Sequence, residues 1–230
     1  MSDDDLCNCT RTRLIEFLIQ SAHELKLSPI VKYSAFSIFA DRFYPSVARM
    51  GENKGARHWL LVPLTESKLQ LFVVISFWIS SKIHDSPPIS VKDLKKLTDK
   101  FIKEQHFTSR DFLDAEVVLL QVLEFEIGTS RIAFVFLDEL VKEFKAVACI
   151  GEYLSFESCM DVMDLLYEEE ETSSFSPRTL AASVLVAAYA ITVPIQRWEF
   201  PVIPWVKFVA SCNEDDVMGM VRKILKHVFG

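Results

Sequence analysis

Hydrophobic residues recur at helical spacing along almost the whole chain. Residues 11–26 place leucine and phenylalanine side chains on one stripe of a predicted helix, and residues 31–44 repeat that pattern. Residues 45–63 contain two glycines and several charges, which predict a long surface loop. The alternation of apolar and polar positions typical of strands is missing from the sequence, so the pattern predicts an all-α protein.

Two segments are apolar on every side and predict buried central helices. Residues 65–83 carry leucine, valine, isoleucine, phenylalanine and tryptophan around the whole helix, and a helix of this kind must be surrounded by others. Residues 176–193 share this property but are rich in alanine. The longest apolar stretches, residues 69–79 and 181–195, fall short of the ~20 residues that cross a bilayer, so no membrane partner is predicted.

Amphipathic segments are available to wrap each central helix. Ser90 with Asp93, and Thr108 with Asp111, have the spacing of capping boxes and mark two helix starts. Ser176 followed by proline is typical of a third start. Three prolines between residues 194 and 204 predict an irregular connection, and further helices are predicted over residues 132–146, 156–168 and 215–229.

These elements divide the chain into two tandem lobes of about five helices, each with its own buried central helix. Residues 1–10 are expected to form a short acidic tail, residues 11–128 the first lobe and residues 129–230 the second. The same plan occurs twice without a short fixed period, which predicts a structural repeat and not a solenoid.

Charge and cysteine content narrow the classes of function. The 230 residues include 25 Lys and Arg against 32 Asp and Glu, a net charge of −7 that argues against a nucleic-acid partner, because phosphate binding needs a basic surface. The five cysteines are odd in number and mostly far apart, which favours a reducing compartment. The acidic N-terminus does not resemble a secretory signal, so an intracellular protein of the nucleus or cytoplasm is expected.

Patterns typical of catalytic and metal sites are missing from the sequence. Phosphate-binding, dinucleotide-binding, nucleophile-elbow and zinc-protease motifs do not occur, and the five histidines are scattered. His84 and Asp85 are neighbours, but adjacent residues of a helix do not face each other. The sequence therefore predicts a protein that is not an enzyme and has neither a metal site nor a cofactor.

One constellation of motifs goes beyond composition. The first central helix ends in Ser80-Ser81-Lys82, which is followed by Ile-His-Asp-Ser-Pro-Pro. A later helix carries Asp114-Ala-Glu116 ahead of Leu-Gln-Val-Leu-Glu-Phe-Glu-Ile. The second helix carries Asp41-Arg42-Phe43. These motifs resemble the cyclin box over about residues 11–128, while the second lobe matches by helix count and by its central helix. The short tail and the phenylalanine-rich second helix are similar to the small plant J-type cyclins.

The resemblance implies two tandem cyclin-fold lobes and a non-catalytic subunit that binds and activates a cyclin-dependent serine/threonine kinase, controlling the cell cycle or cell division. In this family the lysine at the Lys82 position bonds backbone carbonyls near the kinase's regulatory helix, and the glutamate at the Glu116 position completes the contact. Phe112 and Leu113 are implied as apolar contacts. From the residues alone, Lys82 is also explained as a cation at a helix C-terminus, and Glu116 as a solvated side chain.

The family's substrate-docking patch on the first helix is only partly matched. Arg11, Leu14 and Phe17 fit its pattern, and the resemblance implies a structural ion pair between Arg11 and Asp41. Two other positions of the patch carry Thr and Arg where the family has apolar residues. The patch is therefore expected to be weakened, and with it the docking of R-x-L substrates.

Two other classes of function remain open. A cyclin-fold transcription adaptor would need a basic surface, and the net charge of −7 counts against it. A helical scaffold that acts independently of kinases would not need Lys82 and Glu116, so the presence of both residues counts against that class.

Overall fold

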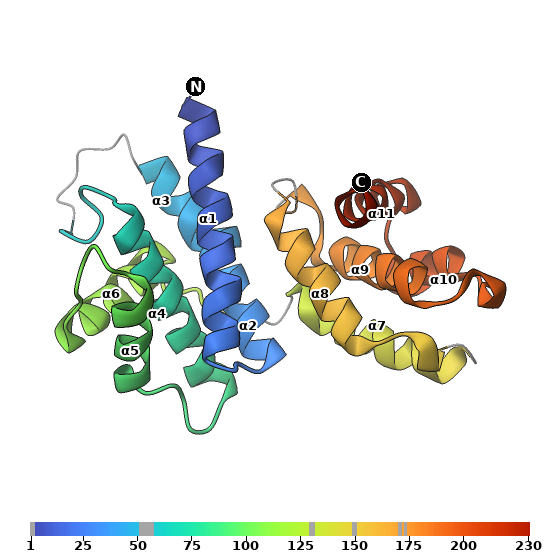
Figure 1. The fold of residues 1–230 in the computed structure, drawn as a ribbon, viewed down its shortest axis with the longest axis horizontal. Coiled ribbons are helices and arrows are strands. Elements are labelled where there is room, and N and C mark those ends of the chain that lie inside the picture. The colour runs from blue at the N-terminus through green and yellow to red at the C-terminus, as the bar shows by residue number, and fades with distance from the viewer. Residues whose placement is uncertain (1–2, 51–57, 129–131, 149–150, 170–171, 173) are drawn as a thin grey trace. The chain divides into compact units, whose positions relative to one another are not determined.

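The chain forms two compact units, residues 1–129 and 130–230. The computed structural model describes residues 3–50, 58–128, 132–148, 151–169, 172 and 174–230, with side chains from Thr10 onward except that of Met50. Over these ranges all regular secondary structure is helical (Figure 1), which confirms the predicted fold class.

The first unit is built around helix α4 (Glu66–His84). Around it lie α1 (Asp3–Glu24), α2 (Pro29–Phe36), α5 (Val91–Phe101) and α6 (Ser109–Val122), each of which contacts α4. Every side chain of α4 from Ser67 to Ser81 is buried except that of Gln70. The prediction of an enclosed central helix is therefore confirmed for this unit.

Helix α1 begins at Asp3 and so includes most of the residues that the sequence analysis assigned to a short acidic tail. Acidic residues are favoured in the first turn of a helix, where their charge opposes the positive end of the helix dipole. The hydrophobic stripe that marks this helix begins only near Leu14, and the helix extends beyond it toward the N-terminus.

The second helical run is longer and less regular than its pattern predicts. Helix α2 passes without a break into a π-helical segment, η1 (Ser37–Phe43), and then into α3 (Tyr44–Met50). The ring of Phe43 packs against that of Phe72 on α4, with centroids 4.5 Å apart. The predicted surface loop is thus helical over residues 45–50; residues 51–57 of that loop lie outside the described ranges.

The second unit repeats this plan around α9 (Pro177–Thr192). Its neighbours are α7 (Ala133–Val147), α8 (Phe156–Glu168), α10 (Val202–Ala210) and α11 (Glu214–Phe229), with short 3-10 turns at η2 (Gly151–Tyr153) and η4 (Ile195–Arg197). The proline-rich stretch predicted as irregular contains α10. Pro201 precedes this helix and Pro204 lies in its first turn, where a proline ring interrupts no helical hydrogen bond.

Capping side chains set the starts of several helices as predicted. Ser90 accepts a hydrogen bond from the backbone of Asp93, and Thr108 forms a complete capping box with Asp111. At the start of α9, Ser176 accepts a hydrogen bond from the backbone N–H of Thr179 at 3.1 Å. These local signals explain why the sequence places these three helix starts accurately.

A buried lysine holds the segment that enters α4. Lys68 is only 7 % exposed, and its ammonium donates to the carbonyls of Trp59 at 2.7 Å and Pro63 at 2.9 Å. The same nitrogen lies 5.5 Å from the centroid of the Trp59 ring. Lys68 thus joins two backbone carbonyls of the irregular segment before α4 to the first turn of that helix.

Substituting Lys68→Met is expected to lower the free energy of unfolding by about 2 kcal/mol, because two carbonyls lose a charged donor. The matched control is Lys100→Met, which breaks an exposed ion pair with Glu24 and should change stability by less than about 0.5 kcal/mol. Urea denaturation followed by circular dichroism measures both values. Equal effects of the two substitutions would contradict the proposed role of Lys68.

Candidate protein-binding site

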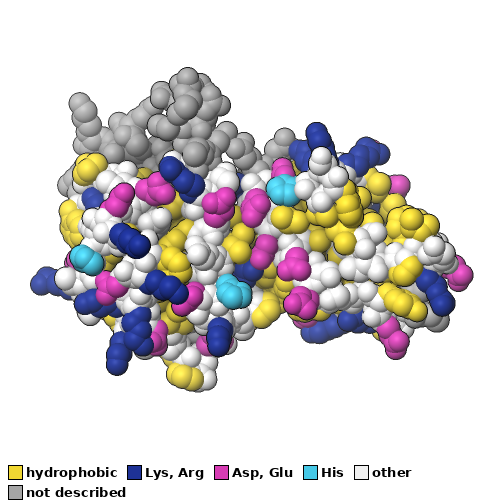
Figure 2. Space-filling model, viewed as in Figure 1, with side chains coloured by type: hydrophobic (Ala, Val, Ile, Leu, Met, Phe, Trp, Pro, Cys, Tyr) yellow, Lys and Arg dark blue, Asp and Glu magenta, His cyan; other side chains and the backbone are white. Residues whose placement is uncertain are grey.

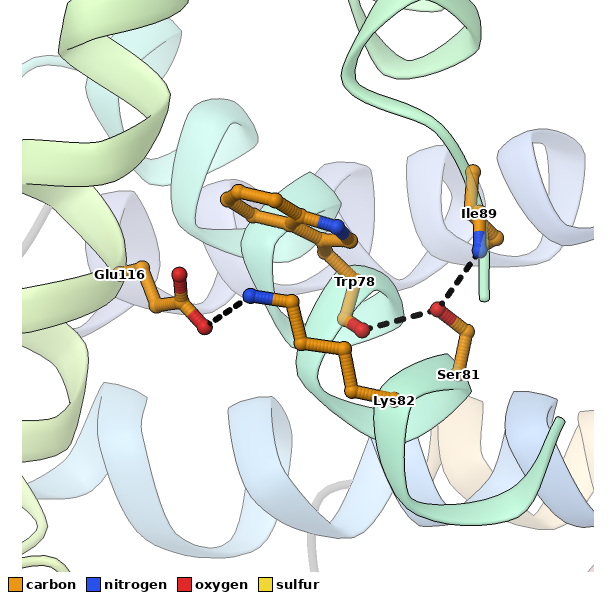
Figure 3. A network of polar contacts seen from close by, with 5 residues as sticks. All are labelled: Trp78, Ser81, Lys82, Ile89 and Glu116. Carbon is orange, nitrogen blue, oxygen red and sulfur yellow. Dashed lines mark hydrogen bonds and ion pairs between the residues drawn. The ribbon is translucent and has the colours of Figure 1, made fainter. Parts of the chain in front are cut away.

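The C-terminal end of α4 is fixed by two serines that serve different purposes. Ser80 is fully buried and donates a hydrogen bond to the carbonyl of Val31 at 2.7 Å, which joins α4 to α2. Ser81 donates to the carbonyl of Trp78 at 2.8 Å and accepts from the backbone N–H of Ile89 at 3.1 Å (Figure 3). Small hydroxyl side chains at these positions therefore lock the helix end against its neighbours.

Lys82 follows these serines and meets Glu116 on α6. The ammonium lies 2.5 Å from Oε1 of Glu116, and 37 % of the lysine side chain and 17 % of the glutamate side chain are exposed. On its other side the ammonium faces the indole of Trp78, 3.6 Å from the ring centroid (Figure 3). The structure thus brings together two residues that are 34 positions apart in the chain.

Exposed apolar side chains flank this ion pair. Leu113 and Val117 on α6 are 53 % and 50 % exposed, and Ile83, directly after Lys82, is 44 % exposed. We call Lys82, Glu116 and these three residues the α4–α6 surface. A charged pair with exposed apolar side chains next to it on the same two helices has the composition of a protein-binding surface.

Phe112, which the resemblance implied as an apolar contact, does not belong to this surface. Its side chain is fully buried and therefore packs within the first unit. Leu113 points outward, in agreement with a contact role. Val117 and Ile83 were not singled out from the sequence, although Val117 lies one helical turn after Leu113 and shares its face.

The predicted docking patch on α1 presents little apolar surface. Leu14 and Phe17 are 1 % and 7 % exposed, so both side chains belong to the core. Arg13 is exposed and forms an ion pair with Glu66 on α4 at 3.0 Å. Desolvation raises the pKa of the Asp41 carboxyl to about 6, and the hydrogen bond from Ser37 and the nearby guanidinium of Arg11 oppose this shift only in part.

Other kinds of site find no support in the described residues. Among these residues, no group of three or more His, Cys, Asp and Glu side chains is arranged to hold a metal ion. Within the same ranges, every helix is too short or too polar to cross a bilayer. On the face shown in Figure 2, Lys and Arg side chains are interspersed with Asp and Glu, unlike the continuous basic surface that nucleic acids need.

Comparison with known proteins gives one consistent result. The family described as "Cyclin, N-terminal domain" matches residues 1–128. The chain is 57 % identical to Cyclin-J18 of Arabidopsis thaliana over 220 residues, covering 95 % of this chain and 94 % of that protein. It is 50 % identical to a Cyclin-J18-like protein of Oryza sativa over 226 residues, covering 95 % and 87 % of the two chains.

Solved structures agree on the fold. The crystal structure of a viral cyclin from herpesvirus saimiri superposes with a TM-score of 0.68 at 20 % identity, covering 94 % of this chain and 83 % of that chain. A chain of the CAK complex of Chaetomium thermophilum, bound to ATP-gamma-S, superposes with a TM-score of 0.54 at 15 % identity, covering 94 % and 62 %.

Proposed function

The chain belongs to the cyclin family, and we propose that it is a regulatory subunit that binds and activates a cyclin-dependent serine/threonine kinase. We further propose that it acts inside the cell, in the nucleus or cytoplasm, in control of the cell cycle or cell division. The observation that carries the proposal is the α4–α6 surface, where Lys82 and Glu116 meet among exposed apolar side chains.

The geometry of the α4–α6 surface suits binding to a helix of the partner. The last carbonyls of a helix have no partner within that helix, and a lysine ammonium carries donors that satisfy such groups. Glu116 supplies a carboxylate that accepts hydrogen bonds from backbone or side-chain donors. Ile83, Leu113 and Val117 would become buried around these polar contacts, which strengthens them by excluding water.

Activation would follow from the position of the bound helix. A protein kinase needs its regulatory helix in place so that a lysine–glutamate ion pair and the metal site assemble. A rigid surface that binds this helix shifts the kinase toward the active arrangement, because binding energy is available only in that state. The chain itself needs no catalytic group for this function.

The direct test is reconstitution with a panel of purified cyclin-dependent kinases. We expect a complex that survives size-exclusion chromatography with at least one kinase, and phosphorylation of a peptide substrate that depends on the chain. A charge-reversed double variant, Lys82→Glu with Glu116→Lys, is the matched control because it retains an ion pair but inverts its direction. If the chain formed a complex with none of the kinases in the panel, the proposal would be overturned.

Substrates with an R-x-L motif are expected to bind no more tightly to the chain than peptides with alanine at both motif positions. The reason is that Leu14 and Phe17 are buried and that Arg13 is engaged by Glu66 where an apolar side chain would be needed. Fluorescence anisotropy with labelled peptides measures this difference. Saturable binding that is lost in Phe17→Ala would contradict the expectation.

A further inference from the structure

The Lys82 ammonium makes an unusually close contact with an aromatic ring. Its distance of 3.6 Å from the Trp78 centroid compares with 5.0–6.0 Å for six other cation–ring contacts among the described residues. The same nitrogen is 2.5 Å from Glu116. Figure 3 shows the ammonium between the indole and the carboxylate, so one atom is held from two sides.

We infer that Trp78 is a positioning residue of the α4–α6 surface, which places the Lys82 ammonium for contact with the partner before binding. This inference rests on the proposed function. Trp78 lies one helical turn before Lys82 on α4, so both side chains project from the same face of the helix. The indole is 6 % exposed, which means that its neighbours in the first unit fix the ring.

Holding the lysine in advance matters because of its flexibility. A lysine side chain has four rotatable bonds, and a solvated lysine loses this freedom when a partner orders it. Of the residues the structure describes, only Glu116 accepts a hydrogen bond from the Lys82 ammonium, so two of its three donors face no acceptor there. The exposed part of the side chain, 37 %, leaves these donors accessible to a partner.

A purely structural role for Trp78 makes a different prediction. If the indole only fills space beneath the surface, its removal weakens kinase binding whether or not Lys82 is present. If the indole acts through Lys82, its removal has no further effect once the ammonium is gone. A double-mutant cycle separates these cases, because it measures the coupling between two side chains in contact.

The cycle uses the full chain with one purified kinase that it binds. The four proteins are wild type, Trp78→Leu, Lys82→Met and the double variant, with thermal melting to confirm that each is folded. We expect Trp78→Leu to weaken binding about fivefold in the wild-type background and to leave the affinity of Lys82→Met unchanged. Trp78→Phe, which keeps an aromatic face, should retain most of the affinity.

Tryptophan fluorescence provides a second measurement that needs no kinase. Removing the ammonium with Lys82→Met should change the emission of the free protein, and this change should vanish when Trp78 is leucine. The three other tryptophans remain in all variants and serve as the constant background.

The possible outcomes separate the two proposals. Equal loss of affinity for Trp78→Leu in both backgrounds, or unchanged emission in Lys82→Met, would overturn the role of Trp78 alone. A wild-type chain that binds none of the kinases would overturn the proposed function, and the positioning role in binding with it.

Discussion

Replacing Lys82 by alanine is expected to weaken kinase binding by at least about 30-fold, or about 2 kcal/mol. Without the ammonium, backbone carbonyls of the partner and the carboxylate of Glu116 would be buried at the interface without a donor. Glu116→Ala should have an effect of the same order, because it removes the other half of the pair. Isothermal titration calorimetry with the purified kinase measures both losses.

Folding should be almost unaffected by these two substitutions. The Lys82–Glu116 pair is partly exposed in the free chain, and exposed ion pairs contribute at most about 1 kcal/mol to stability. A matched control is Lys142→Ala on α7, which removes an ion pair of the same 2.5 Å length with Asp138 in the other unit. Wild-type affinity in both Lys82→Ala and Glu116→Ala would show that the kinase binds elsewhere.

The architecture was largely predictable because its main signals are local. A helix that is apolar on every side has to be enclosed, and α4 and α9 are the two helices contacted by every other long helix of their units. Serine and threonine caps at Ser90, Thr108 and Ser176 mark helix starts through hydrogen bonds over three residues. Both signals depend on spacing along the chain and are visible without tertiary structure.

The elements that were not predicted depend on tertiary packing, or contain residues whose usual preference does not hold at their position in the helix. The π-helical segment η1 has no sequence period of its own, and its Phe43 packs against Phe72, 29 residues away in sequence. Pro204 resembles a helix breaker but lies in the first turn of α10, where proline is tolerated. Pro45 closely follows the π-helical segment within one helical run, which its sequence does not reveal. The start of α1 extends past its hydrophobic stripe, so periodicity underestimates its length.

In the candidate site, too, some features could be predicted from the sequence and others depend on tertiary packing. The residue types and spacing alone explain Lys82 as a cation at a helix C-terminus and Glu116 as a solvated side chain. The motif resemblance predicted that the two residues act together, and the structure places the Lys82 ammonium 2.5 Å from the Glu116 carboxylate. The sequence offered no way to decide which of the neighbours Phe112 and Leu113 faces outward. Only the packing of α6 decides it, with Phe112 fully buried and Leu113 53 % exposed.

This pair of neighbours provides the second large effect. Leu113→Asp is expected to weaken kinase binding by about 30-fold or more, because a carboxylate would be buried at the centre of an apolar contact. Stability should change by less than about 0.5 kcal/mol, since Leu113 is exposed in the free chain. Val147→Asp, on a similarly exposed residue of α7, is the matched control and should bind the kinase normally.

Phe112→Ala should show the reverse pattern. Removing a fully buried phenylalanine leaves a cavity and is expected to lower the free energy of unfolding by about 3–5 kcal/mol. The folded fraction should nevertheless bind the kinase with nearly normal affinity, because the outer face of α6 keeps its side chains. Urea denaturation and calorimetry on the same samples separate the two properties. If Phe112→Ala weakened binding while Leu113→Asp did not, α6 would present its other face to the partner, and the assignment of the α4–α6 surface would be wrong.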